Sequence, residues 1–269
     1  MRRSNSVCRA NTDPRGPKRC NNVKHLKALS IDDVTPESRA DVPDLAWTDA
    51  ERDLPALWRE YADHPDFVAA GLAVLQGHVD VEPEVMTAMQ QVVSGSGSRL
   101  TGLEYRLKSP ASLVRKVVSK FALANRDAGV SDAESYAGRL NDVLRFTVET
   151  PEQDSITGAL RTTVERLHGS GLRVMEIDNK YVEGNPYKGV HLKVAAAGGV
   201  LFEVQIHSSE GLRIKEQAHL HYELARDVNR SVVERQASEV LSRRLYDELP
   251  TPAGLEHVEQ IDGIPVRKS

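Results

Sequence analysis

Apolar and polar residues alternate along five short stretches in the second half of the chain, and this alternation predicts β-strands. The stretches are LEYRLK (103–108), VLRFTVE (143–149), RVMEIDNKYV (173–182), GVHLKVAA (189–196) and VLFEVQIH (200–207). Helical spacing of apolar residues predicts helices over 110–126, 153–168, 210–229 and 231–247. A Gly-Gly pair between the last two strands suits a hairpin, so part of the sheet should be antiparallel. The expected fold is α/β (α+β), with a mixed sheet of about five strands flanked by helices.

The first hundred residues predict helices without strands. Thr48 is a plausible N-cap for a helical stretch interrupted at Pro55, and two more helices fit 65–77 and 82–94. SGSGS (94–98) then reads as a flexible joint. Residues 1–44 are polar and show no apolar period, which predicts a flexible basic leader. We therefore expect a leader (1–44), a helical cap (45–98), a catalytic domain (99–230) and a C-terminal helix and tail (231–269).

The composition of the chain limits which classes of protein are plausible. The chain has 269 residues, of which 40% are hydrophobic, and no apolar run is long enough to span a membrane. Its N-terminus lacks the apolar stretch of a secretory signal, so we expect a cytoplasmic protein. Cys8 and Cys20 match no zinc pattern. We expect free thiols, with one disulfide in an exported protein as the alternative.

Positive charge is concentrated in two segments of a chain whose net charge is −4. Residues 1–29 carry eight Lys/Arg against one acid, and residues 104–126 carry six against one. In YRLK, alternation would place Arg106 and Lys108 on one face, and Ser109-Pro110 then predicts a helix start. Ser112 and Lys116 share a face of that helix, so these groups could converge on a polyphosphate. A solvated basic helix after an edge strand is the alternative.

Two acids stand where a strand would normally carry apolar or neutral residues. Asp142 opens the strand around Arg145, and Glu203 lies within VLFEVQIH. Carboxylates on two neighbouring strands form a plausible Mg²⁺ site, because Mg²⁺ prefers oxygen ligands and completes its shell with substrate phosphates. A turn aspartate and a salt-bridged glutamate are the structural alternatives.

The loop NPYKGVH (185–191) supplies a candidate base-binding group. Tyr187 could stack on a nucleobase, with Lys188 and His191 near its phosphates or sugar, although a packed surface tyrosine is the commoner outcome. Further on, Lys215, His219 and Tyr222 recur at helical spacing, and His219 and His221 are not at the spacing of zinc ligands.

Four motifs in order resemble the synthetase domain of the RelA/SpoT homologue family, the alarmone synthetases. YRLKSPASLVRK is similar to the family's R-x-K…S…K motif, and LNDVLRFTV to its D-x-x-x-R strand. PYKGVH is similar to its G-Y-x-S-x-H loop, and FEVQIHS to its E-V-Q-I-R-T strand. The match covers about residues 100–225 and implies a nucleotidyltransferase-like sheet.

The resemblance implies transfer of the β,γ-pyrophosphoryl group of ATP to the 3′-hydroxyl of an acceptor nucleotide. Asp142 and Glu203 would be catalytic and hold Mg²⁺. The residues implied for ATP are Arg106, Lys108, Ser112, Lys116 and Arg145. Those implied for the acceptor are Tyr187, Lys188, His191 and Gln205.

Departures from the family pattern leave the acceptor open. Pro186 stands where Gly is usual, Gly189 replaces Ser, and His207 replaces a fixed cation. No HD-type hydrolase signature is seen before the motifs in this sequence, and we expect no regulatory domains after them. These features resemble small or toxic members of the family, for which a guanine or adenine nucleotide is the expected acceptor and an antitoxin or immunity protein a candidate partner. The alternatives are a toxin that pyrophosphorylates the tRNA 3′-CCA end, delivered as an effector, and an inactive nucleotide-binding sensor.

Overall fold

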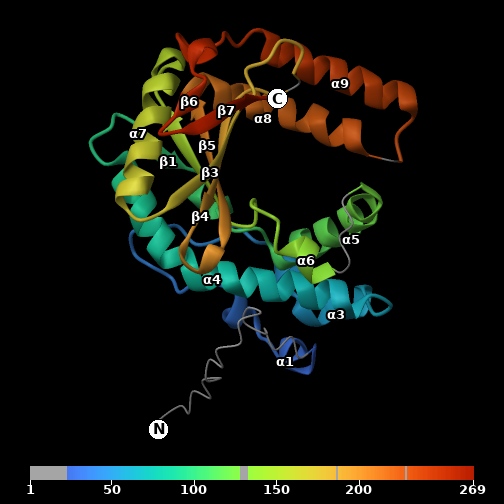
Figure 1. Ribbon diagram of the computed structural model, residues 1–269. Helices are drawn as coiled ribbons and strands as arrows, with labels where there is room; N and C mark the ends of the chain where they lie inside the picture. Colours follow the sequence, from blue (N-terminus) through green and yellow to red (C-terminus); the bar gives the residue numbers. More distant parts are fainter. Residues whose placement is uncertain (1–22, 128–132, 186, 228) are drawn as a thin grey trace.

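The computed structural model describes residues 23–127, 133–185, 187–227 and 229–269. In this part of the chain seven strands form one mixed sheet in the order β1-β2-β5-β4-β3-β7-β6 (Figure 1). The strands are β1 (Arg99–Thr101), β2 (Arg145–Thr150), β3 (Arg173–Asn179), β4 (Val190–Ala195), β5 (Leu201–Ser208), β6 (Gln260–Ile261) and β7 (Ile264–Lys268). The β2–β5 and β3–β7 pairs are parallel and the other neighbours antiparallel. The mixed α/β class is confirmed, with two more strands than expected.

The helices in this part of the chain cover both faces of the sheet. They are α1 (Val23–Lys27), α2 (Asp49–Arg52), α3 (Leu54–Glu60), α4 (Pro65–Val93), α5 (Pro110–Asp127), α6 (Ala133–Ala137), α7 (Ile156–Gly169), α8 (Ser209–Arg226) and α9 (Val232–Asp247). Helix α7 packs on one side of the sheet, and α8 packs with α9 on the other (Figure 1).

Strand β5 at the centre of the sheet shows how alternation divides core from site. Phe202, Val204 and Ile206 are completely buried and belong to the main hydrophobic core. The intervening residues Glu203 and Gln205 point to the opposite face, where Gln205 accepts a hydrogen bond from Lys215 of α8. The polar face of β5 therefore lies under α8.

Helix α4 is one continuous helix of 29 residues, where two helices (65–77 and 82–94) were expected. Pro83 lies inside it and removes one backbone donor. Leu72 and Leu75 before the proline and Met86 and Met89 after it are all fully buried. Burial on both sides of Pro83 stabilises the helix through the interruption.

Helix α5 lies unusually close to α4. A Cβ on Gly71 of α4 would lie 2.9 Å from Cγ2 of Val114, so only glycine allows this approach. Helix α5 begins at Pro110, and Ser112 N donates to Ser109 Oγ at 3.3 Å, which confirms the predicted N-cap. The contact between Gly71 and Val114 fixes the position of α5 against α4.

The prediction of a strand at 103–108 is wrong. Residues Leu103–Tyr105 form a 3₁₀ turn (η2) after Gly102, whose φ is 64°, and only Leu107 makes an isolated bridge to Leu144. Arg106 holds this turn closed, because its guanidinium donates to the carbonyl of Leu103 at 2.9 Å. The first true strand is β1, antiparallel to β2.

The expectation of a flexible leader is corrected for residues 23–44. Leu26, Val34 and Val42 are buried, and a 3₁₀ turn (η1, Ile31–Val34) packs against α4. Residues 1–22, including Cys8 and Cys20, lie outside the described part of the chain. In the C-terminal tail, β6 and β7 form a hairpin whose second strand extends the sheet beside β3.

No helix in the described ranges combines the length and apolar content that crossing a membrane requires.

Val34→Ala tests whether the segment before residue 44 belongs to the core. Val34 is completely buried, so its truncation should lower the free energy of unfolding by about 1–3 kcal/mol. Val23→Ala is the matched control, because Val23 is 38% exposed and should change stability by less than about 0.5 kcal/mol. Urea denaturation measures both. Equal, negligible effects would contradict the packing of this segment.

Candidate active site

Asp142 lies just before β2 and faces two lysines. Its Oδ2 accepts from Lys116 Nζ of α5 at 2.5 Å, and Lys108 Nζ lies 3.5 Å away. Burial raises the pKa of Asp142, but the two ammonium groups outweigh it and the net pKa is lowered. The second oxygen, Oδ1, is buried and has no hydrogen-bond partner among the described residues. Asp142 therefore has one oxygen free for a ligand.

The pKa of Lys108 is also lowered, which for a lysine disfavours the charged form. Burial lowers its pKa, Asp142 raises it, and the neighbouring charges of Lys116 and Arg145 lower it further, with a net lowering. Three cations around one carboxylate leave positive charge uncompensated at this end of β2.

Glu203 lies on β5 beside the same strand. The parallel register pairs it with Arg145 of β2. Its Oε1 accepts from His191 Nδ1 at 2.9 Å and its Oε2 from Gln205 Nε2 at 2.7 Å. Burial raises the pKa of Glu203, while His191, Gln205 and Arg145 lower it more strongly, so the net pKa is lowered. Both predicted catalytic carboxyl groups are thus held ionised near neutral pH.

Two adjoining cavities share Asp142 and Arg145. The smaller, about 250 Å³, is lined by residues of α2, η2 and the start of α5. Lys108 and Ser112 line it together with Trp47, whose Nε1 donates to the carbonyl of Leu107 at 2.9 Å. The larger, about 540 Å³, lies between the sheet and the helices α8 and α9. Glu203, Gln205, Tyr187 and His191 all line this larger cavity.

Glu51 of α2 is a residue of the smaller cavity that sequence reasoning missed. Its Oε1 accepts from Ser109 Oγ at 2.7 Å and from Ser112 Oγ at 3.3 Å. These bonds, led by that from Ser109, lower the pKa of Glu51. A carboxylate therefore lies at the start of α5, where the sequence predicts a phosphate. Nothing in the local sequence links residue 51 to residue 109.

Arg106 lies away from both of these cavities in a buried ion pair. Its Nε donates to Glu82 Oε1 of α4 at 2.7 Å, and the two side chains are 5% and 1% exposed. Its Nη1 donates to the carbonyls of Pro43 and Leu103. Because alternation fails at η2, Arg106 does not lie beside Lys108 as expected, and its implied contact with ATP stays a prediction.

Lys188 also lies outside the larger cavity. Its Nζ reaches the carbonyl of Leu249 at 3.3 Å, and the side chain lines a separate cavity with Asp247 and Thr251. Neighbouring side chains of this loop therefore enter different cavities: Tyr187 lines the larger cavity and Lys188 the separate one. Pro186 is outside the described residues.

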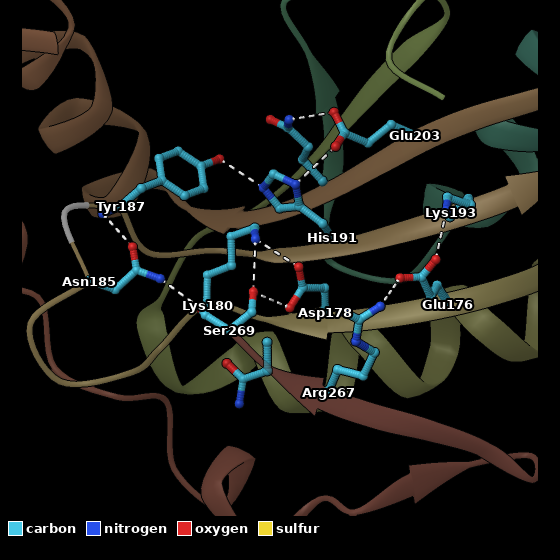
Figure 2. A network of polar contacts seen from close by, with 12 residues as sticks. Glu176, Asp178, Lys180, Asn185, Tyr187, His191, Lys193, Glu203, Arg267 and Ser269 are labelled. Atoms are coloured by element: carbon cyan, nitrogen blue, oxygen red, sulfur yellow. Dashed lines mark hydrogen bonds and ion pairs between the residues drawn. The ribbon is translucent and has the colours of Figure 1, made fainter. Parts of the chain in front are cut away.

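Tyr187 joins two histidines through its hydroxyl. Its oxygen lies 3.0 Å from His191 Nε2 and 2.8 Å from His207 Nε2. Figure 2 shows the ring pointing toward His191, which in turn contacts Glu203. Burial raises the pKa of Tyr187 well above its usual value and lowers that of His207 well below it, so both are neutral.

The network fixes proton positions when His191 is neutral. A carboxylate only accepts, so His191 Nδ1 carries the proton to Glu203 and its Nε2 accepts from the Tyr187 hydroxyl. His207 Nε2 must then donate to the same oxygen, leaving its buried Nδ1 as the atom without a partner. The hydroxyl of Tyr187 is thus held by the two histidines, and the tyrosine lines the larger cavity.

The same loop is anchored to the last strand of the sheet. Tyr187 N donates to Asn185 Oδ1, and Asn185 Nδ2 donates to the carbonyl of Ser269 at 2.7 Å (Figure 2). Ser269 Oγ also contacts Asp178 and Lys180 of the neighbouring segment. Ser269, the residue that follows β7, therefore helps to place the loop that carries Tyr187.

The donor set fits Mg²⁺. Asp142 and Glu203 line one cavity, and the buried Oδ1 of Asp142 lacks a partner. Mg²⁺ binds by one or two carboxylates and completes its shell with substrate phosphates, which two acids in one cavity would allow.

Two departures from the family motifs, Gly189 and His207, are in contact. A Cβ on Gly189 would lie 2.5 Å from His207 Cε1, closer than packed atoms approach. A serine at position 189 is therefore incompatible with His207 in this position.

Gly189→Ala should lower the free energy of unfolding by about 1–3 kcal/mol, because the added methyl group overpacks the His207 ring. His207→Ala should remove that penalty, so the double variant should be more stable than the sum of the single effects predicts. Chemical denaturation of the four proteins measures the coupling. Additive effects would show that the two positions do not compete for space. Gly158→Ala, with no atom within 4 Å of the added Cβ, is the control.

Comparisons with known proteins found no match among family models or curated proteins. Among solved structures, a complex of the type VI effector Tas1 and its immunity protein is similar at 19% identity, covering 68% of this chain and 94% of that chain, with a TM-score of 0.39. A GTP pyrophosphokinase family protein from Streptococcus pneumoniae is similar at 18% identity, covering 71% and 89%, with a TM-score of 0.39. The small alarmone synthetase 1 from Bacillus subtilis, bound to its product pppGpp, is similar at 16% identity, covering 64% and 94%, with a TM-score of 0.38. Similarity at this level carries no argument about activity, which rests on the motifs and the site.

Proposed function

We propose that the chain is a nucleotide 3′-pyrophosphokinase that uses ATP as donor. The observation that carries this proposal is the pair of adjoining cavities that share Asp142 and Arg145. A transfer reaction needs a donor and an acceptor site that meet at the reacting atoms. Asp142 lines both cavities, and Glu203 lines the larger one beside the shared Arg145. The resemblance of the four motifs implies that the transferred group is a pyrophosphoryl group.

The smaller cavity suits the donor. Lys108 and Lys116 are both bonded to Asp142, so the carboxylate occupies the position of an anion that they could exchange for ATP phosphates. Arg145, for which no side-chain partner is found among the described residues, lies where both cavities meet. Its fixed charge would stabilise negative charge as the pyrophosphoryl group moves.

The larger cavity suits the acceptor. Its 3′-oxygen would attack the β-phosphorus of ATP, the bond from the α-phosphate bridging oxygen to that phosphorus would break, and AMP would leave. Glu203 would take the hydroxyl proton, with His191 and Gln205 holding its carboxylate in place. Asp142 and Glu203 would hold Mg²⁺, which supplies charge neutralisation at the phosphates.

A thin-layer assay with γ-labelled ATP tests the proposal. GDP, GTP, ADP and tRNA are offered separately, and label should move from ATP to the acceptor with release of AMP. Transfer to tRNA alone would favour the CCA-end toxin, and transfer to none would favour the inactive sensor. A toxic role, with which an immunity-protein partner and delivery as an effector would be consistent, is tested by growth arrest on expression, which Asp142→Asn should abolish.

Asp142→Asn and Glu203→Gln should each lower the rate of transfer by at least about 100-fold, because each removes a charge that holds Mg²⁺ or accepts the proton. Glu152→Gln is the control, since Glu152 is exposed at the other end of β2. Circular dichroism melting confirms folding of each variant. Activity within tenfold of wild type in either site variant would contradict the catalytic assignment.

Glu51→Gln should tighten binding of α,β-methylene-ATP by about 3- to 10-fold, because it removes a negative charge facing the triphosphate. Glutamine keeps an oxygen for Ser109 and still suits the capping box with Thr48. Asp49→Asn, on the same helix but exposed, should change the affinity by less than about twofold. Weaker binding by Glu51→Gln would show that Glu51 helps to hold the donor. Calorimetric titration measures all three proteins.

A further inference from the structure

Lys215 is a half-buried cation of the larger cavity that has no role in the proposed reaction. It lies on α8, and its Nζ donates to Gln205 Oε1 of β5 at 2.9 Å. Among the described residues, no carboxylate oxygen lies within 4 Å of this ammonium group. The other lysine of the cavity, Lys180, differs because it is bonded to Asp178 at 2.7 Å. The partners of Lys215 in the described residues are therefore a neutral amide and an aromatic ring, Gln205 and Tyr187, and not an opposite charge.

Such a charge is costly to bury without an opposite charge. Burial lowers the pKa of Lys215 to about 8, with repulsion from Arg145 acting in the same direction and Glu203 opposing both. An anion bound beside Lys215 and Arg145 would reverse this lowering. The surroundings of Lys215 are those of an incomplete ion-binding site.

The position of Lys215 separates it from the donor. It lines the larger cavity and not the smaller one, whose cations are Lys108 and Arg145. Its Nζ lies 5.9 Å from the ring centroid of Tyr187, so a group held by Lys215 would lie next to the proposed base-binding ring. His207, at the end of the same strand as Gln205, is neutral and cannot supply the charge.

We propose that Lys215, together with Arg145, binds a phosphate of the acceptor nucleotide in the larger cavity. Lys215 would thereby be the residue that selects an acceptor carrying at least one 5′-phosphate over the free nucleoside. This inference rests on the proposed function for the identity of the ligand as acceptor.

The experiment measures binding rather than transfer. The donor site is first saturated with α,β-methylene-ATP and Mg²⁺, because its bridging carbon prevents cleavage. Calorimetric titration then follows the binding of ADP, GDP, adenosine and guanosine. The variants are Lys215→Met, which removes the charge at similar length, and Lys215→Arg, which keeps it.

Wild-type protein should bind one diphosphate at least tenfold more tightly than its nucleoside. Lys215→Met should weaken the diphosphate by at least tenfold and the nucleoside by less than twofold. Lys215→Arg should stay within about threefold of wild type for both, which also shows that the position tolerates substitution. Equal weakening of nucleoside and diphosphate, or no preference for diphosphate in the wild type, would overturn the proposal.

The pH dependence supplies a second readout. The affinity of wild type for the diphosphate should fall by about tenfold from pH 7 to pH 9, as the free ammonium loses its proton through a pKa of about 8. Lys215→Arg should fall by less than twofold, because its charge does not titrate in this range. Terminal phosphates are already ionised at pH 7. The charged or titratable groups that face or surround Lys215 are Asp142 (before β2), Arg145 (β2), Lys180 (after β3), His191 (β4), Glu203 and His207 (β5), Tyr187 (loop), His219 and Tyr222 (α8) and Tyr246 (α9).

A flat profile in the wild type would contradict the role of Lys215. Failure of the proposed function has a different signature: charge-dependent binding of the diphosphate would persist while no label moves from ATP to any acceptor. Loss of α,β-methylene-ATP binding alone would count against the donor site and leave the comparison of diphosphate with nucleoside intact.

Discussion

The buried ion pair between Arg106 and Glu82 is the constraint on which the geometry of the site depends. Its two side chains are almost completely buried, so removing either partner would leave an uncompensated charge. The same arginine bonds the carbonyls of Pro43 and Leu103, and its own carbonyl accepts from Arg145 N at 2.7 Å. One residue thus joins the N-terminal segment, α4, the 3₁₀ turn and the start of β2. The placement of Lys108 and Arg145 follows from this junction.

Charge neutralisation within the protein sets how ligands can enter. Asp142 is compensated by two lysines, Glu203 by a histidine and an amide, and the start of α5 by Glu51. A phosphate in the smaller cavity would compete with carboxylates that already satisfy the same donors. Binding there is an exchange of partners rather than the filling of an empty site, and its strength depends on the difference between the two sets of bonds.

The parts of the fold that depend on local pattern were predictable, and those that depend on distant partners were not. Alternation located β2 to β5, and Ser109-Pro110 located the start of α5. The region 103–108 failed because the conformation of Arg106 is decided by Glu82, 24 residues earlier. The final hairpin was missed although Asp262-Gly263, with φ values of 49° and 79°, is a typical two-residue turn between apolar residues.

The candidate site divides in the same way. Asp142, Glu203, Tyr187, His191 and Gln205, which the motifs point to, all line the larger cavity, and their roles there stay predictions. Glu51 and Lys215 carry no motif, and only the packing of α2 and α8 against the site places them there. Both residues lie in segments that the sequence predicts to be helical, but a helix prediction does not say which face of the helix meets the site.

Trp47 gives the smaller cavity an optical property. Its indole is buried, lines that cavity and is fixed through Nε1 to the carbonyl of Leu107. The chain has only one other tryptophan, Trp58, which lies under the ammonium group of Lys27 and does not line the cavity. Occupancy of the smaller cavity can therefore be followed in the unlabelled protein through the intrinsic emission of Trp47, without a signal from a tryptophan in the larger cavity, because none lines it.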